Sequence, residues 1–245
     1  MWVAGHGGMV GSLPIRRLAV EECEVLTVDR ITIDLTDRAA VRGWMDRQHP
    51  QAVIVAAARV GGLLANSTRP VDFLLDNLLI ETAVIEAAHD YAAEKLLYLG
   101  SSCIYPRLAP QPIREDALLT GPLETTNESY ALAKIAGIRL TQSYREQYGS
   151  DFIGAMQTNL YRPGDNYDAR CEPCSARADR QGRHGSAGRH PGHHLGLGHA
   201  GPRVLYIDDC ADACVHLLAH YSGATPLNIG AGQDISILEL TRLVM

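Results

Sequence analysis

The chain has 245 residues, of which 46% are hydrophobic and 20% are charged, and both values are typical of a soluble globular protein. This length is enough for one sizeable α/β domain. The net charge of −6 argues against nucleic acid or an anionic membrane as the main partner. No apolar run approaches the ~18 to 20 residues that span a bilayer, and the N-terminus has no basic stretch followed by an apolar core. We therefore expect a cytoplasmic protein.

The first 160 residues alternate between strand and helix patterns, which predicts a parallel sheet with helical crossovers. The expected strands cover residues 1–4, 24–28, 52–57, 95–99 and 152–158. The expected helices cover residues 9–20, 38–48, 71–93 and 128–148. The third strand is apolar throughout, as a strand covered on both faces should be. We predict an α/β fold, a Rossmann-type doubly wound parallel sheet with a small, incomplete C-terminal substrate domain.

Residues 168–202 interrupt this pattern, because they contain no Val, Ile, Met, Phe, Tyr or Trp. Such a segment cannot bury enough apolar surface to offset its ordering entropy, so we expect a loose insert. Regular patterning resumes with a strand at 204–207 and a helix that Asp208 or Asp209 caps and that runs to about His220. A last helical pattern, 237–245, has no C-cap, which suggests a truncated product. The expected parts are an NAD(P)-binding domain (1–167), the insert (168–202) and a remainder of substrate domain with the final Rossmann elements (203–245).

Three glycines, Gly5, Gly8 and Gly11, are spaced G-x-x-G-x-x-G between the first strand and the first helix. A turn of this kind brings backbone N–H groups to a pyrophosphate at the positive end of the helix. The spacing alone is a weak signal, because glycines also mark ordinary turns. Asp29 follows the second strand, where an acid can hold a ribose hydroxyl, although a solvated turn residue fits equally well.

Tyr130 and Lys134 stand four residues apart in a predicted helix, so their side chains share one face. We expect the lysine to lower the tyrosine's pKa from its ordinary ~10 and to make it a proton donor at neutral pH. Ser101 and Cys103 follow the strand 95–99, at the sheet edge where parallel sheets bind ligands. A serine there is by itself most often a cap, but beside a tyrosine and a lysine it indicates carbonyl reduction.

Five runs of sequence carry a resemblance to a known family: residues 5–12, 56–62, 100–106, 130–137 and 158–161. They closely resemble the GDP-L-fucose synthase family, a branch of the extended short-chain dehydrogenases/reductases. The resemblance implies an NADPH-dependent enzyme that converts GDP-4-keto-6-deoxymannose into GDP-L-fucose, with a nucleotide-sugar substrate and a homodimer. A rhizobial nodulation-signal pathway is one setting for such an enzyme.

The resemblance also implies roles for particular residues. Ser101, Tyr130 and Lys134 would reduce the C4 ketone, and Cys103 would be the acid/base for epimerisation at C3 and C5. The alternative for Cys103 is a buried small residue at a strand end. The implied cofactor-binding residues are Gly5, His6, Gly7, Gly8, Met9, Val10, Gly11, Leu99, Gly100, Ser102, Gln157, Thr158, Asn159 and Leu160, and the implied substrate contacts are Asn159 and Arg203.

The chain departs from the family pattern at several positions. Pro173 stands where the family has its second epimerisation residue, a histidine, and Gly7 stands where the family has an arginine. The missing arginine weakens the case for reading the 2′-phosphate of NADPH, so NAD stays possible. The unusual composition of 168–202 suggests a compensated reading-frame shift. An NAD-dependent nucleotide-sugar epimerase or dehydratase, and a catalytically impaired dinucleotide-binding protein, therefore remain alternatives.

Cysteine usage adds one further hypothesis. The six cysteines are scattered, so we expect reduced thiols. Cys171 and Cys174, with five nearby histidines, are zinc-ligand types, but their spacing matches no standard zinc finger. We expect no metal site.

Overall fold

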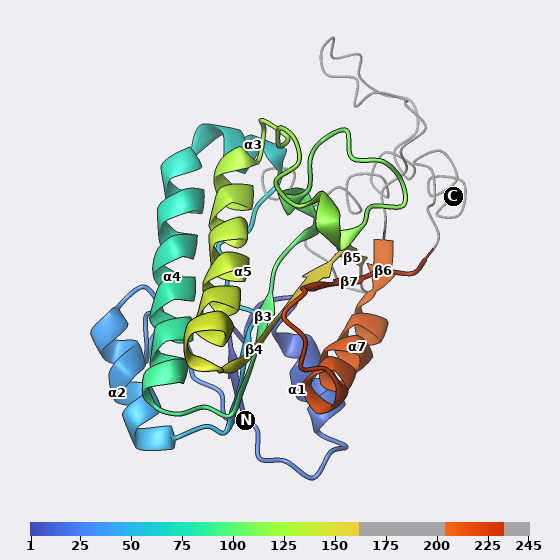
Figure 1. Ribbon diagram of the computed structural model, residues 1–245. Coiled ribbons are helices and arrows are strands. Elements are labelled where there is room, and N and C mark those ends of the chain that lie inside the picture. The colour runs from blue at the N-terminus through green and yellow to red at the C-terminus, as the bar shows by residue number, and fades with distance from the viewer. Residues whose placement is uncertain (162–203, 233–245) are drawn as a thin grey trace, which may run out of the picture.

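The computed structural model describes residues 1–161 and 204–232 (Figure 1). Several expectations lie outside these ranges: the insert at 168–202 with Cys171, Pro173 and Cys174, the contact at Arg203, and the helix at 237–245.

The main sheet has five strands, each parallel to its neighbours. In spatial order they are β1 (Trp2–Ala4), β2 (Ala52–Val55), β3 (Lys95–Leu99), β4 (Asp151–Gln157) and β7 (Leu227–Ile229). A second, two-stranded sheet pairs β5 (Asn159–Tyr161) with β6 (Val204–Tyr206) in parallel. The predicted Rossmann-type parallel sheet is therefore confirmed.

Helices cover both faces of the main sheet (Figure 1). One face carries α2 (Arg38–Gln48), α4 (Pro70–Asp90) and α5 (Glu128–Tyr148); the other carries α1 (Ser12–Leu18) and α7 (Ile207–His220). The shorter helices are α3 (Leu63–Thr68) and the 3₁₀ turns η1 (Ser102–Ile104) and η2 (Glu115–Ala117). Within the described residues, no helix is both long and apolar enough to cross a membrane.

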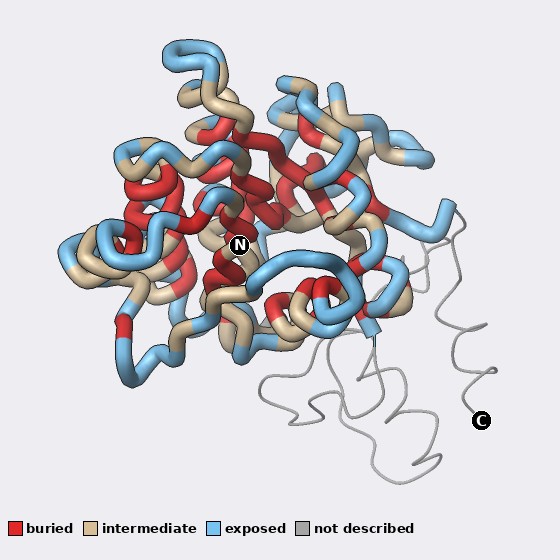
Figure 2. Tube along the Cα trace, turned by 90° about the horizontal axis from the view of Figure 1, so that it is seen from below, coloured by how far each residue is buried: buried red, intermediate tan, exposed pale blue. Residues whose placement is uncertain are grey.

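The core lies in two layers because successive strand residues point to opposite faces. Val53 and Leu96 belong to the layer beneath α4 and α5, whereas Ile54 and Leu97 belong to the layer beneath α1 and α7. Figure 2 shows the buried residues concentrated along the strands and the inner sides of the helices. This double burial explains why the strand patterns are apolar throughout rather than alternating.

Local signals account for several helix ends. Asp37 caps α2, since its carboxylate accepts hydrogen bonds from the backbone N–H groups of Ala39 and Ala40. Gly149 follows α5 directly, and its φ of 73° ends the helix in a left-handed conformation that favours glycine. Such caps explain why the predicted bounds of α2 and α5 match the structure.

The structure corrects three sequence predictions. Residues 24–28 form only an isolated bridge between Leu26 and Trp2, because β1 offers a short edge and none of the five residues is buried. The first helix covers 12–18 rather than 9–20, which places Pro14 in the first turn, where its missing N–H removes no helix hydrogen bond. Tyr206 is the N-cap of α7, so Asp208 and Asp209 lie inside the first turn and do not cap it.

The order of the strands creates a crevice beside β1. The chain leaves β1, lies against it on one side at Leu26, and returns on the other side as β2. Dinucleotides bind parallel sheets at the carboxyl end of a strand where the winding reverses in this way. The turn that begins at Gly5 lies at that end of β1.

Candidate active site

The glycine turn after β1 is shaped by close backbone contacts. Gly5 has a φ of 91°, and a Cβ atom there would lie 2.5 Å from the Cα of Ala57. A Cβ atom at Gly11 would lie 2.0 Å from the carbonyl oxygen of Gly5, and the N–H of Gly8 donates to that same oxygen at 3.0 Å. A Cβ atom at Gly7 would meet nothing within 4 Å. Gly5 and Gly11 are therefore required by packing, whereas Gly7 faces open space.

A cavity of about 520 Å³ opens beside this turn. Its walls include Gly5 to Gly8, the segment around Asp29 and Arg30, and the residues that follow β2. Asp29 is 78% exposed and lies 3.3 Å from the Nε2 atom of His6. Among the described residues, Arg30 forms no ion pair. The cavity, with its glycine backbone and the Arg30 guanidinium, whose charge also helps to lower the pKa of Asp34, fits a dinucleotide phosphate group.

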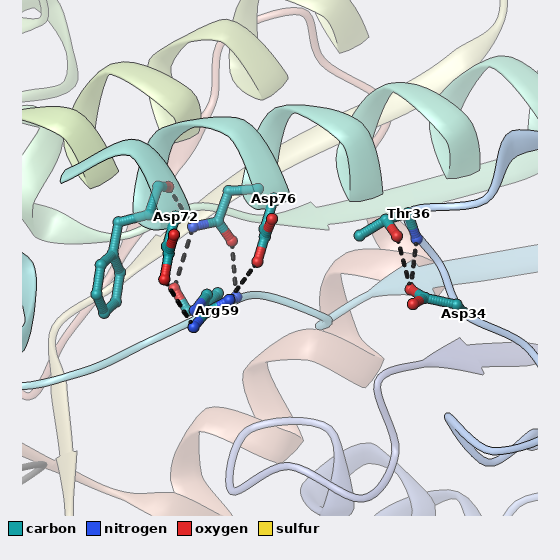
Figure 3. A network of polar contacts seen from close by, with 7 residues as sticks. Asp34, Thr36, Arg59, Asp72 and Asp76 are labelled. Carbon is teal, nitrogen blue, oxygen red and sulfur yellow. Dashed lines mark hydrogen bonds and ion pairs between the residues drawn. The ribbon is translucent and has the colours of Figure 1, made fainter. Parts of the chain in front are cut away.

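Ion pairs fasten the cavity wall to α4 (Figure 3). The Arg59 guanidinium pairs with Asp72 at 3.0 Å and with Asp76, and both acids point from α4 to the segment after β2. Asn77 accepts from the Arg59 N–H at 2.7 Å and donates to its carbonyl oxygen at 3.0 Å. We call these contacts of Arg59 with Asp72, Asp76 and Asn77 the Arg59 clasp. The sequence did not reveal it, although Arg59 lies in the run 56–62 that resembles the family.

Figure 3 also shows a second contact, between Asp34 and Thr36. The Asp34 carboxylate accepts hydrogen bonds from the backbone N–H of Thr36 at 3.0 Å and from its hydroxyl at 2.8 Å. These hydrogen bonds hold the pKa of Asp34 below its ordinary value. Both residues line the cavity, and neither was singled out from the sequence.

The structure brings the four predicted catalytic side chains together at the carboxyl end of β3. The Lys134 Nζ atom lies 6.0 Å from the ring centroid of Tyr130 and donates to the carbonyl oxygen of Leu99 at 2.9 Å. Ser101 is the N-cap of η1, and its Oγ atom accepts a hydrogen bond from the Cys103 N–H at 3.4 Å. Hydrogen bonds also join the Ser101 side chain to the Tyr130 phenol and to the Cys103 thiol.

Burial controls the protonation of this cluster. It raises the pKa of Tyr130, and the negative fields of Cys103 and Glu81 raise it further, while the hydrogen bond with Ser101 opposes them. The expectation that Lys134 lowers the tyrosine's pKa is therefore wrong here, because desolvation of the phenolate dominates. Burial also raises the pKa of Cys103 to about 11, against the Ser101 hydrogen bond and the charge of Lys134. Both groups carry their protons at neutral pH.

The other predicted cofactor residues fall into two groups. The first lies at the ends of β3 and β4, where Gln157 Oε1 and Thr158 Oγ1 are buried with no hydrogen-bond partner in the described part of the chain. Two such orphaned polar atoms at the carboxyl edge fit a polar ligand. In the second group, Leu160 is 5% exposed in the core, and Met9 and Val10 pack against the same core layer. These three contribute apolar packing rather than polar contacts.

Sequence comparison places the chain among known relatives. Residues 1–230 match the NAD dependent epimerase/dehydratase family. The chain is 52% identical to the GDP-L-fucose synthase of Sinorhizobium fredii, over 100% of this chain and 78% of the relative. It is 46% identical to GDP-L-fucose synthase 1 of Arabidopsis thaliana (100% and 76%) and 41% identical to the GDP-L-fucose synthase of Escherichia coli (100% and 79%).

Structure comparison gives a consistent result. A solved structure described as DdhaC has a TM-score of 0.86 at 30% identity, covering 99% of this chain and 82% of that one. The Campylobacter jejuni GDP-mannoheptose C4 reductase MlghC, solved with NADP bound, has a TM-score of 0.85 at 25% identity (99% and 83%). The chain belongs to the NAD dependent epimerase/dehydratase family and, within it, to the GDP-L-fucose synthases.

Proposed function

We propose that this chain is an NADP-dependent epimerase/reductase that converts GDP-4-keto-6-deoxy-D-mannose into GDP-L-fucose. The observation that carries the proposal is the cluster of Ser101, Tyr130 and Lys134 at the carboxyl end of β3, in a chain 52% identical to a GDP-L-fucose synthase. The glycine turn and the cavity beside β1 support a dinucleotide next to that cluster.

In the reduction, Tyr130 would be the proton donor. Its phenol is protonated at neutral pH, as a general acid for a developing alkoxide must be. A nicotinamide, when bound, would supply the hydride for C4 of the sugar. The Ser101 hydroxyl would donate a hydrogen bond to the ketone oxygen, and the Lys134 ammonium would hold the nicotinamide ribose and place positive charge near the forming alkoxide.

In the epimerisation, Cys103 would move protons at C3 and C5. With its pKa raised to about 11 the thiol is suited to returning a proton to carbon, and it needs the charge of Lys134 to act as a base. The family's partner histidine corresponds to Pro173, outside the described residues. Epimerisation is accordingly the step in which we expect this chain to be slowest.

Arg30 is our candidate for the 2′-phosphate of NADP. It lines the cavity, and among the described residues it forms no ion pair that would occupy its guanidinium. A guanidinium is the usual partner of a phosphate, and Gly7 supplies none. MlghC, a relative by structure, was solved with NADP bound, which supports NADP as the cofactor.

The alternatives have less support. The UDP-glucose 4-epimerase of Thermus thermophilus, solved in complex with NAD, shares the fold at 23% identity, which shows the fold alone. The chain's similarity to three GDP-L-fucose synthases favours reductive chemistry over an NAD-retaining epimerase or a binding-only protein.

For the assembly we propose a cytoplasmic homodimer that pairs α4 and α5 with their copies. These helices pack side by side, and they carry exposed apolar side chains. The exposed residues are Val71, Leu75, Leu79 and Leu132. Sedimentation of the purified chain at several concentrations tests this proposal, and a monomer throughout would contradict it.

The function is tested with purified protein, NADPH and GDP-4-keto-6-deoxymannose. We expect NADPH oxidation together with GDP-L-fucose, identified by chromatography and NMR. Binding of NADPH without oxidation would instead favour the binding-only alternative. A reduced product that keeps the manno configuration would show that reduction works while epimerisation does not.

A further inference from the structure

A buried carboxylate that the proposed mechanism does not use lies behind the catalytic lysine. Glu81 is in the middle of α4 and is 2% exposed. Its Oε2 atom accepts a hydrogen bond from the Tyr98 hydroxyl at 2.5 Å, and the backbone of Gly137 lies close beside the carboxylate. Its Oε1 atom is buried with no hydrogen-bond partner among the residues that the structure describes. Burying a charge so incompletely satisfied is costly, so a compensating charge is needed nearby.

Tyr98 lies between this carboxylate and Lys134. The Lys134 Nζ atom is 4.7 Å from the centroid of the Tyr98 ring, within the range of a cation–π contact. Lys134 is itself 3% exposed, and its ammonium donates a hydrogen bond to a neutral group, the Leu99 carbonyl. The ring thus separates a buried anion from a buried cation, and no direct ion pair joins them in the described part of the chain.

Gly137 makes this layer possible. It is three residues after Lys134, on the same side of α5. A Cβ atom there would lie 2.3 Å from Tyr98 Cζ and 2.9 Å from Glu81 Oε2. Any side chain at this position would push the phenol and the carboxylate away from the lysine, so the glycine is required by this particular arrangement.

We propose that Glu81 is a positioning residue for the reduction, whose carboxylate acts across the Tyr98 ring to keep the buried Lys134 in its charged form. The proposal rests on the function proposed above. The titratable groups that face the lysine come from four elements: Glu81 from α4, Tyr98 from β3, Cys103 from η1 and Tyr130 from α5. At neutral pH the tyrosines and the thiol carry their protons, so Glu81, whose pKa is raised to about 7, is the acid of this set that ionises in the neutral range.

The electrostatics of the pair agree with this geometry. Burial lowers the pKa of Lys134, and the field of Glu81 opposes that shift. Burial raises the pKa of Glu81 to about 7, while Lys134 and the Tyr98 hydrogen bond oppose it. Removing the carboxylate should therefore remove the negative field that opposes the effect of burial, so the pKa of Lys134 should fall.

The chain offers a direct measurement, because Lys95 and Lys134 are its only lysines. Selective ¹³C-lysine labelling gives two NMR signals, and Lys95, which pairs with Asp151, serves as the internal reference. We expect Glu81→Gln, which keeps the shape of the side chain, to lower the pKa of Lys134 by about one unit. Tyr98→Phe should act in the same direction but less. Glu86→Gln, on the same helix and paired with Arg38 at the surface, is the matched control and should leave Lys134 unchanged.

The kinetic readout is the pH profile of kcat. In Glu81→Gln the alkaline limb should move to lower pH by about one unit, with NADPH affinity within about threefold of the wild type. A lower kcat with an unmoved limb and an unmoved Lys134 pKa would show a merely structural role and overturn the inference. A shifted Lys134 pKa in a protein whose wild type oxidises no NADPH would bear out the electrostatic coupling of Glu81 and Lys134, but it would refute the proposed function and with it a role of Glu81 in reduction.

Discussion

The two halves of this site are built in different ways. The cofactor half, around the glycine turn and the Arg59 clasp, uses backbone contacts and ion pairs whose partners remain partly exposed to water. The catalytic half, around Tyr130 and Lys134, uses titratable groups that are largely removed from water. Backbone shape therefore decides what the first half binds, and desolvation decides the protonation states in the second. Substitutions that change one of these properties at a time can separate the halves.

The largest effect is expected at Tyr130. Tyr130→Phe removes the proton donor and little contact area, so the rate of ketone reduction should fall about 10³-fold while NADPH affinity stays nearly intact. Stopped-flow reduction and fluorescence titration measure the two quantities. A variant with wild-type activity would refute the role of Tyr130, and a loss of both properties would show that the halves are not separable.

The catalytic half should also contribute to the pH dependence of stability. The pKa of Glu81, about 7, lies above its ordinary 4.5, so the folded state binds the proton more tightly than the unfolded state does. Its stabilising contribution is present below pH 4.5 and is lost as the pH rises to 7. Between these values, the wild type should lose about 3 kcal/mol of unfolding free energy relative to Glu81→Gln, as an upper estimate. Urea denaturation at pH 5 and pH 7.5 measures it, and parallel profiles would contradict it.

The cofactor half is tested by a matched pair of glycine substitutions. In Gly11→Ala the added Cβ would meet the Gly5 carbonyl oxygen at 2.0 Å, so the turn must shift. We expect NADPH affinity to fall about thirtyfold, equivalent to about 2 kcal/mol of strain. Gly7→Ala places its Cβ in open space and should bind NADPH nearly as the wild type does. Equal losses in both variants would mean that the turn acts through flexibility rather than shape.

The smallest effect is expected at Asp29, where two interpretations from the sequence remain open. The side chain is 78% exposed, and its ion-pair partner is His6. Because water screens such a group, Asp29→Asn should change NADPH affinity by less than about threefold. Isothermal titration with NADPH and with NADH measures this. A tenfold loss would assign Asp29 to the ribose after all.

Local patterns in the sequence determined much of this molecule. The bounds of α2, β3 and α5 follow from caps, apolar runs and a terminal glycine within each segment. The spacing of Tyr130 and Lys134 likewise places both on one face of a helix before any tertiary contact is known. Such features depend on neighbours a few residues away, so they can be read directly from the chain.

Tertiary structure decided the remainder. The short strands β5 and β7 exist only through partners far away in sequence, and the segment at 24–28 lacks the burial that would make it a full strand. Glu81 and the Arg59 clasp are also brought to the site by packing. The direction of the Tyr130 pKa shift depended on how completely the fold removes water from the phenol, because the free energy of a buried charge is set by its whole surroundings rather than by one neighbour on the same helix.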